Sequence, residues 1–227
     1  MGKAKMQKLR EVSLFPNVFE NRDFRNPSIS NYEGEKVELK GKWSELVFDN
    51  KNPITLELAC GKGDYTLKLA EKFNDRNFIG VDIKGDRLWR AAKTSNEKSL
   101  TNTAFLRTKI EQLSYFFEPG EVSEIWITFP DPCPKKPDTK RRLLSPNFLD
   151  LYKSLLHKGS VVHIKTDAID LFEYSIESIR SNNFEIKTIQ RDIYSKPLEN
   201  DLLSIKTYYE LMHIRDGRTI NYLSFII

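Results

Sequence analysis

The stretch Leu56-Glu57-Leu58-Ala59-Cys60-Gly61-Lys62-Gly63-Asp64 places two glycines where an apolar, strand-like run gives way to an amphipathic, helix-like run. Glycine permits a tight turn and lets the backbone approach a ligand closely. Alone, this G-x-G pattern is weak evidence, because any compact strand-to-helix turn favours the same residues. Asp82 strengthens it, since this carboxylate ends the next strand-like run about 20 residues further on.

An acid at that place accepts hydrogen bonds from both hydroxyls of a ribose, so the pattern predicts a nucleoside cofactor. NAD, FAD and S-adenosylmethionine all present such a ribose. Thr66 stands where the full dinucleotide pattern has its third glycine, and S-adenosylmethionine has no pyrophosphate that needs this glycine. The carboxylate of Glu57, near the end of the first strand-like run, also suits the sulfonium-bearing amino acid of this cofactor. The residues expected to bind the cofactor are Glu57, Gly61, Gly63 and Asp82.

After Pro53, short apolar runs alternate with amphipathic runs, which is typical of βαβα order and of a parallel sheet with helices on both faces. Ser145 and Pro146 mark one helix start, as cap and first-turn residue. We therefore expect an α/β fold with a doubly wound, mainly parallel sheet. Strands are expected at 54–60, 78–83, 104–106, 124–129 and 160–165, and helices at 65–73, 87–95, 146–157 and 168–181.

The end of the chain departs from this alternation. Runs at 184–191, 207–214 and 219–227 are interpreted as strands, with Asp216-Gly217 as the turn between the last two. This pattern predicts a C-terminal antiparallel hairpin added to the sheet.

The start of the chain also differs. Residues 1–45 mix charges, asparagines and scattered aromatics without a sustained period. We expect an N-terminal arm there, with flexibility of its own, followed by a single domain over 46–227. The 227 residues suffice for one large domain with a sizeable core.

Charge and cysteine content narrow the cellular context. Lys and Arg outnumber Asp and Glu by 36 to 32, a net charge of +4 that says little about partners by itself. Cys60 and Cys133 lie far apart and form no ligand pair, so neither a disulfide framework nor a metal site is expected. No apolar run approaches the roughly 18 residues of a membrane span, and the N-terminus lacks the apolar stretch of a signal peptide. We expect a cytoplasmic protein without a membrane partner.

The segment Phe129-Pro130-Asp131-Pro132-Cys133-Pro134-Lys135-Lys136-Pro137-Asp138-Thr139-Lys140-Arg141-Arg142 joins a strand-end carboxylate to five bases. Its four prolines favour a stiff loop over a helix. Asp131 lies where open α/β sheets bind ligands, and the bases can pair with phosphates. The first ten residues hold four further bases and no acid, so two patches suit a polyanion. The alternative for each patch is a solvated basic surface.

Two further motifs, His163-Ile164-Lys165-Thr166-Asp167 and Thr207-Tyr208-Tyr209-Glu210, complete a recognisable set. Together with the glycine turn, Asp82 and the proline-rich loop, they resemble the bacterial tRNA (guanine-N7)-methyltransferase family from about residue 50 onward. The resemblance implies a class I, Rossmann-like methyltransferase fold and S-adenosyl-L-methionine as cofactor. It also implies methyl transfer to N7 of the guanosine at position 46, in the variable loop of tRNA. The sequence leaves monomer and homodimer as alternatives.

The resemblance further implies roles for individual residues. Asp131 takes the position that the family treats as catalytic and also belongs to the cofactor site. The substrate-binding positions are Lys135, Asp167, Thr207, Tyr208, Tyr209 and Glu210. The RNA-contacting positions are Lys136, Lys140, Arg141 and Arg142.

Some positions have a second interpretation or depart from the family pattern. Asp167 is equally suited to cap the helix that follows it, and the segment 207–210, taken alone, is better explained as an ordinary strand. Cys133 stands where the family commonly has Trp between the prolines. Lys109 stands where an acid near the adenine is expected, with Glu111 close by.

Two other function classes compete with this interpretation. One is an RNA-binding module without catalysis on a degenerate methyltransferase fold, and the other is a methyltransferase for another RNA or a small molecule. The pairing of Asp82 with Asp131 disfavours the first, and the basic loop disfavours a small substrate. Guanine N7 carries a lone pair and no proton, so its methylation requires positioning and charge stabilisation rather than a general base.

Overall fold

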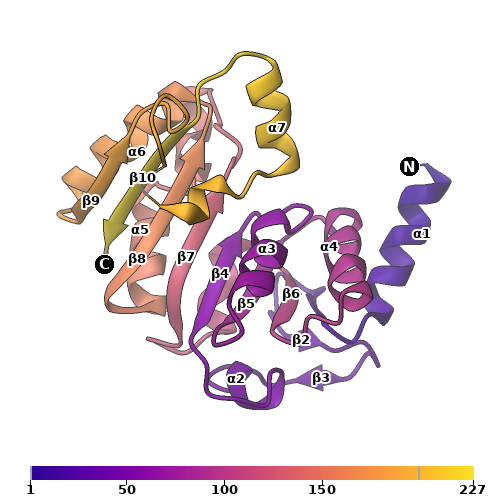
Figure 1. Ribbon diagram of the computed structural model, residues 1–227. Coiled ribbons are helices and arrows are strands. Elements are labelled where there is room, and N and C mark those ends of the chain that lie inside the picture. The colour runs from indigo at the N-terminus through magenta and orange to yellow at the C-terminus, as the bar shows by residue number, and fades with distance from the viewer. Residues whose placement is uncertain (1, 199) are drawn as a thin grey trace.

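The computed structural model describes residues 2–198 and 200–227, with Lys136 described by its backbone alone, and within these residues all strands join one ten-stranded sheet (Figure 1). No helix in the described part of the chain is long and apolar enough to cross a membrane. The α-helices are α1 (Lys3–Glu11), α2 (Trp43–Leu46), α3 (Asp64–Lys72), α4 (Gly85–Glu97), α5 (Pro146–Leu155), α6 (Ile169–Ser181) and α7 (Tyr208–Arg215). The 3-10 helices are η1 (Val12–Leu14), η2 (Ile110–Tyr115), η3 (Lys136–Arg141) and η4 (Asp201–Ser204). The strands are β1 (Val18–Asn21), β2 (Ile29–Ser30), β3 (Lys36–Val37), β4 (Ile54–Leu58), β5 (Asn77–Asp82), β6 (Thr103–Arg107), β7 (Val122–Thr128), β8 (Leu156–Thr166), β9 (Glu185–Gln190) and β10 (Asn221–Ile226).

The centre of the sheet is parallel and both edges are antiparallel. The strand order is β3-β2-β1-β6-β5-β4-β7-β8-β10-β9, and the pairs from β1–β6 to β7–β8 are parallel. β4 lies between β5 and β7, so the chain winds outward from β4 first to one side and then to the other. The carboxyl ends of β4 and β7 are therefore the switch point at which open α/β sheets bind ligands. The expected doubly wound α/β fold is confirmed.

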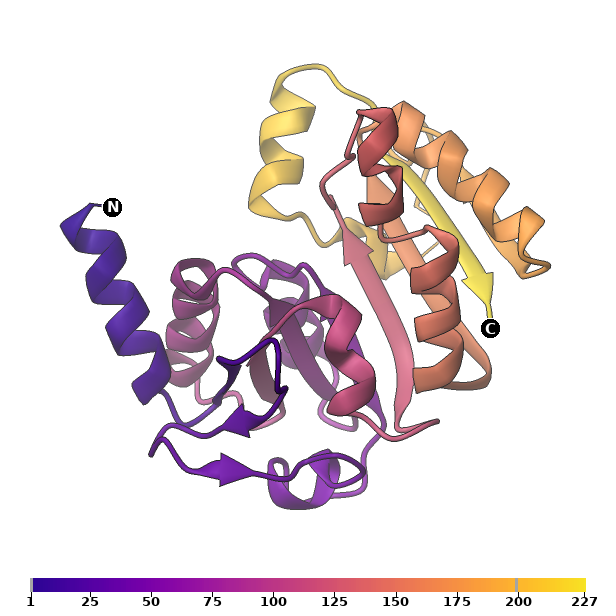
Figure 2. The same cartoon turned by 180° about the vertical axis from the view of Figure 1, so that it is seen from behind.

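Helices cover both faces of the sheet (Figures 1 and 2). Leu56 of β4 and Phe172 of α6 belong to one buried cluster, whereas Phe78 of β5, Trp126 of β7 and Tyr65 of α3 belong to another. Because side chains alternate along a strand, successive residues of the central strands serve these two layers. The central strands are therefore held on both faces, which fixes the positions of their carboxyl ends.

The C-terminal region corrects one prediction. Strands do form within 184–191 and 219–227, as β9 and β10, and they pair antiparallel with each other, but residues 207–214 form most of helix α7 and no strand. Thr207 caps this helix, and Glu210 completes a capping box by accepting from the backbone N–H of Thr207. Asp216-Gly217 ends α7 instead of turning a hairpin: Gly217 has φ 73°, and Arg218 N–H donates to His213 O over 3.0 Å.

The segment expected as an arm is packed onto the domain from Val12 onward. β1 pairs in parallel with β6, which extends the main sheet. Trp43 is fully buried, and its indole Nε1 donates to Phe116 O over 2.8 Å. Helix α1 differs, because none of its residues is buried and it rests against α4.

Candidate functional site

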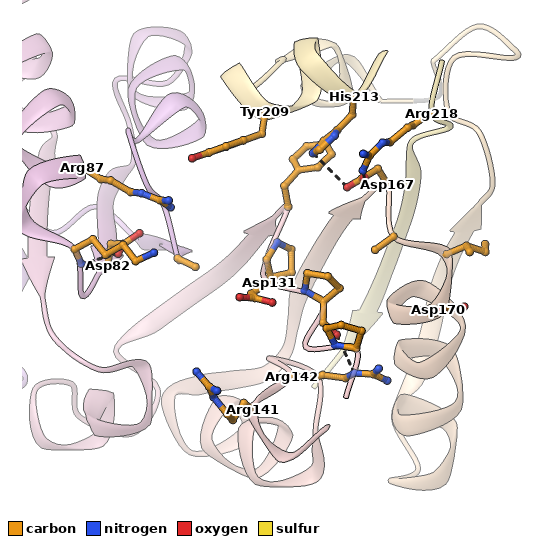
Figure 3. A pocket seen from close by; sticks show the side chains of 18 of the residues that line it. Asp82, Arg87, Asp131, Arg141, Arg142, Asp167, Asp170, Tyr209, His213 and Arg218 are labelled. Carbon is orange, nitrogen blue, oxygen red and sulfur yellow. Dashed lines mark hydrogen bonds and ion pairs between the residues drawn. The ribbon is translucent and has the colours of Figure 1, made fainter. Parts of the chain in front are cut away.

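A cavity of about 810 Å³ opens at the carboxyl ends of β4, β5, β7 and β8 (Figure 3). Three acids line it from the ends of strands: Asp82 ends β5, Asp131 follows β7 and Asp167 follows β8. Arg87 of α4 and Tyr209 of α7 line the cavity as well. The structure thus brings together three of the acids that the sequence singles out, where the sheet topology places a ligand site, whereas Glu57 and Glu210 do not line this cavity.

The glycine turn approaches this cavity through strained backbone. Ala59, Gly61 and Gly63 all have positive φ, at 55°, 57° and 69°. A Cβ on Gly63 would lie 2.8 Å from the Cβ of Ala91, so only glycine lets the start of α3 pack this closely on α4. A Cβ on Gly61 would meet nothing within 4 Å, which leaves the backbone of the turn accessible to a ligand.

Asp82 is held beside this turn. Its Oδ2 accepts from Gly61 N–H over 2.9 Å and its Oδ1 from Lys84 N–H over 2.8 Å. A carboxylate has about four acceptor sites, so both oxygens keep capacity for hydroxyl donors in the cavity. The turn and this acid fit a nucleoside cofactor, and the contact of Asp82 with its ribose stays a prediction.

Glu57 lies beneath the turn and is buried. Its Oε2 accepts from the backbone N–H and the hydroxyl of Thr66 over 2.7 and 2.5 Å, and its Oε1 accepts from the Thr128 hydroxyl over 3.3 Å. Burial raises the pKa of Glu57 to about 7. Glu57 thereby ties β4 to α3 and β7, and its direct contact with a cofactor stays a prediction.

The loop after β7 holds Asp131 in a distorted backbone. Phe129 and Cys133 have positive φ, at 51° and 44°, which is strained for residues other than glycine and is typical of functional sites. Cys133 N–H donates to Oδ1 of Asp131 over 3.0 Å. Arg142 is buried, with its Nε 3.1 Å from Pro132 O and 3.4 Å from Cys133 O. Arg142 therefore holds the loop, and the RNA contact predicted for it would require release from both carbonyls.

The other bases of this loop are differently placed. Lys135 and Lys140 are exposed, whereas Arg141 is exposed at the mouth of the cavity and contacts Asp138 over 3.4 Å. The side chain of Lys136 lies outside the described part of the structure. These placements leave Lys135, Lys140 and Arg141 accessible to a polyanion.

A second cavity, of about 490 Å³, adjoins the first and shares Asp82 and Asp131 with it. Lys109 and Glu111 line it, beside Asp82, at the place where an adenine contact is expected. Cys133 lines it too and supplies no aromatic wall. In the main cavity, aromatic surface comes from Phe129 and Tyr209 instead.

Asp167 does not cap α6, whose N-cap is Ala168. Its Oδ2 accepts from Arg218 over 2.8 Å, and its Oδ1 lies 3.5 Å from Nε2 of His213 (Figure 3). The helix-cap interpretation is therefore wrong, and Asp167 faces the cavity as a partly compensated negative charge.

Helix α7 is fixed over the cavity by a buried ion pair. Nζ of Lys165 lies 2.7 Å from Oε1 of Glu210, and both side chains are fully buried. Lys165 also donates to Leu203 O and Ile205 O over 3.1 Å each, and the Tyr194 hydroxyl donates to Glu210 over 2.6 Å. Burial lowers the pKa of Lys165, and Glu210 opposes that shift.

The segment 207–210 consequently divides between two tasks. Thr207 and Glu210 are buried and hold the helix, so contact of either with substrate would require opening the capping box. Tyr208 lies under Nζ of Lys62, 3.6 Å from the ring centre, and its N–H donates to Asp64 over 2.8 Å. Of the four residues, Tyr209 lines the main cavity.

Comparison with known proteins identifies the chain. A family model described as "Putative methyltransferase" matches residues 51–223. The tRNA (guanine-N(7)-)-methyltransferase of Christiangramia forsetii is 44% identical over 100% of this chain and 99% of its own length. The protein of the same name from Bacteroides fragilis is 42% identical over 100% of this chain and 87% of its own length. The chain belongs to the tRNA (guanine-N7)-methyltransferase family.

Solved structures agree on the fold. The 16S rRNA methyltransferase KamB superposes with a TM-score of 0.64 at 16% identity, covering 85% of this chain and 96% of its own. At this identity the likeness concerns the fold alone, and it confirms the class I methyltransferase fold. Membership of the tRNA (guanine-N7)-methyltransferase family rests on the full-length relatives.

Sequence reasoning missed several charged residues that line the cavity of this family member, among them the three that follow. Arg87, His213 and Arg218 lie on it, and the last two contact Asp167. Arg87 lies in the first turn of α4, close after Asp82 in the sequence, which is a usable signal. His213 lies on α7 and Arg218 follows the turn at Gly217, and both reach the site through tertiary packing, so no local motif marks them.

The raised pKa of Glu57 makes stability depend on pH. Its ordinary value of 4.5 rises to about 7 on folding, so the protonated form is favoured in the folded state. The stabilisation is complete below the unfolded pKa and is lost as pH rises through the folded pKa. We expect the free energy of unfolding to fall by about 3 kcal/mol between pH 4.5 and 7 from this group.

Urea denaturation at several pH values measures how the free energy of unfolding changes with pH. Glu57→Gln removes the titrating group, so the difference between wild type and variant should change across this window. Parallel curves for the two proteins would show that Glu57 is ionised throughout.

Removal of Glu210 should destabilise the protein strongly. Glu210→Ala leaves the Lys165 ammonium buried without a counter-ion, a change that costs about 3–5 kcal/mol. The control is Glu97→Ala, which breaks an exposed ion pair with Lys93 and should cost about 1 kcal/mol or less. Urea denaturation compares the two variants. Equal midpoints would show that the buried pair does not hold α7.

Proposed function

We propose that this protein transfers the methyl group of S-adenosyl-L-methionine to N7 of the guanosine at position 46 in the variable loop of tRNA. The observation that carries the proposal is the convergence of Asp82 and Asp131 on one cavity, in a chain whose full-length relatives are tRNA (guanine-N(7)-)-methyltransferases. The cytoplasmic location expected from the sequence fits a tRNA substrate.

The turn at Ala59 to Gly63 and Asp82 would hold the cofactor. Asp82 accepts the ribose hydroxyls, while the open side of Gly61 admits the rest of the molecule against the backbone. When bound, the cofactor supplies an electrophilic methyl group on a sulfonium. Lys109 and Glu111 border the neighbouring cavity, where the adenine would lie.

Asp131 would act on the guanine. N7 carries a lone pair and gives up no proton during methylation, so the site needs alignment and charge stabilisation. The purine becomes cationic as the methyl group arrives, and the Asp131 carboxylate stabilises that charge and accepts hydrogen bonds from the N–H edge of the base. Tyr209 and Phe129 present rings on the same cavity against which a base can stack.

The exposed bases Lys135, Lys140 and Arg141 would pair with phosphates near the methylated nucleotide. This arrangement favours a nucleic acid over a small substrate. A binding module without catalysis would have no need for a carboxylate held in strained backbone beside a cofactor turn.

Asp131→Asn should abolish most methyl transfer while the fold and tRNA affinity persist. The substitution preserves shape and removes the negative charge that faces the developing cation, so turnover should fall by about a hundredfold or more. The measurement is label incorporated into bulk tRNA from methyl-labelled S-adenosylmethionine, followed by nucleoside mapping. Asp138→Asn, on the same loop but outside both cavities, is the matched control. Turnover of Asp131→Asn equal to that control would remove Asp131 from the chemistry.

Asp82→Ala should weaken cofactor binding without preventing tRNA binding. The variant loses two charge-assisted hydrogen bonds to the ribose, so the cofactor dissociation constant should rise by at least about tenfold. Isothermal titration of the cofactor measures this, with Asp86→Ala on the first turn of α4 as the control. An unmoved dissociation constant would make Asp82 a structural residue that only orients the glycine turn.

A further inference from the structure

Helix α1 is docked in a defined place on α4 even though none of its residues is buried. Oε2 of Glu11 accepts from the Trp89 indole over 2.7 Å, and Nζ of Lys5 lies 3.5 Å from Asp86. Leu9 packs so closely on Gly85 that a Cβ there would lie 3.0 Å from its Cδ2. These contacts hold the exposed face of α1 beside the exposed face of α4.

The paired helices concentrate the positive charge of the chain. α1 carries four bases and one acid, and α4 with its N-cap Lys84 carries four bases and two acids, a net charge of +5. The whole chain has +4, so everything else sums to −1. The paired helices are thus one of two basic concentrations in the chain, beside the loop after β7.

We define the α1–α4 ridge as Lys5, Lys8, Trp89, Arg90 and Lys93. Trp89 is partly exposed, with Nζ of Lys8 and of Lys93 at 4.8 and 5.1 Å from its ring centre. Arg90 is exposed and has no acid within ion-pair distance among the described residues. An aromatic ring between bases is the combination that binds nucleic-acid backbone and bases.

The ridge is continuous with the candidate active site. Arg87 precedes Arg90 by three residues on α4, so the two lie on one face of the helix. Arg87 lines the main cavity, with its guanidinium 5.7 Å from the ring centre of Tyr209. Figure 1 shows α1 beside α4, with its N-terminal end directed toward the same end of the molecule as α7.

We propose that the α1–α4 ridge binds the phosphate backbone of tRNA outside the methylated nucleotide. The proposal rests on the proposed tRNA substrate and adds a second contact region to it. With the guanosine in the cavity, the rest of the folded tRNA would lie at the cavity mouth. Positively charged residues extend from Arg87 at that mouth along α4 to α1. Each phosphate neutralised there releases counterions, which gives affinity without sequence preference.

The test compares two double variants that remove equal charge. Arg90→Ala with Lys93→Ala alters the ridge, and Lys153→Ala with Lys158→Ala alters exposed lysines of α5 and of the start of β8, a strand on the other side of β4 in the sheet from β5 and β6. tRNA binding is measured by filter retention at several salt concentrations, with thermal melting and cofactor titration on each protein.

The ridge variant should raise the apparent tRNA dissociation constant by about tenfold at 0.1 M salt and reduce the slope of log K against log salt by about 1.5. The loss should appear in KM rather than in kcat, with melting and cofactor affinity as in wild type. The control variant should leave all of these values unchanged.

Three results would count against the proposal or its basis. A salt slope and dissociation constant equal to those of the control variant would make the ridge a solvated surface. The wild type could instead sediment with anionic phosphatidylserine vesicles while the ridge variant does not, with the same tRNA affinity in both proteins. That result would assign the ridge to a membrane surface. Wild-type protein that binds tRNA but methylates none would refute the proposed function and leave the ridge in place.

Discussion

The buried ion pair between Lys165 and Glu210 is the interaction on which the arrangement of the site depends. Two charges without water are costly, and they persist only where further hydrogen bonds satisfy them. Here the carbonyls of Leu203 and Ile205, the Tyr194 hydroxyl and the Thr207 N–H complete the set. The pair therefore joins the end of β8 to η4 and α7 through one network in which every polar group has a hydrogen-bond partner.

Helix α7 has little apolar packing of its own. Glu210 is the one buried residue of this helix among those the structure describes, so apolar packing does little to orient it. The ion pair and the contacts of Tyr208 with Lys62 and Asp64 hold the N-terminal turn from two sides. Tyr209, in the C-terminal part of the chain, lines the cavity and contacts Arg87 of α4. Helix α7 therefore connects the elements on both sides of the switch point.

What the sequence could predict follows the range of the interactions involved. The glycine turn, Asp82 and Asp131 were found because a strand end and the residue after it are local in sequence, and parallel topology brings such ends together. The segment 207–214 was misassigned because its tyrosines favour a strand, although Thr207 and Glu210 have the spacing of a capping box. Arg87, His213 and Arg218 belong to the cavity through tertiary contacts that no single segment encodes.

The basic loop after β7 shows the same limit within one motif. Its bases are indistinguishable by composition, yet Arg142 turns inward to two carbonyls and the ring of Tyr174, while Lys135, Lys140 and Arg141 stay at the surface. The strained φ values of Phe129 and Cys133 need such a clamp, because prolines restrict a backbone without donating hydrogen bonds that would hold it. Arg142 is thereby buried in the loop and keeps Asp131 in position. A tRNA extends well beyond the cavity, so we expect its other phosphates to contact positive charge elsewhere in the fold.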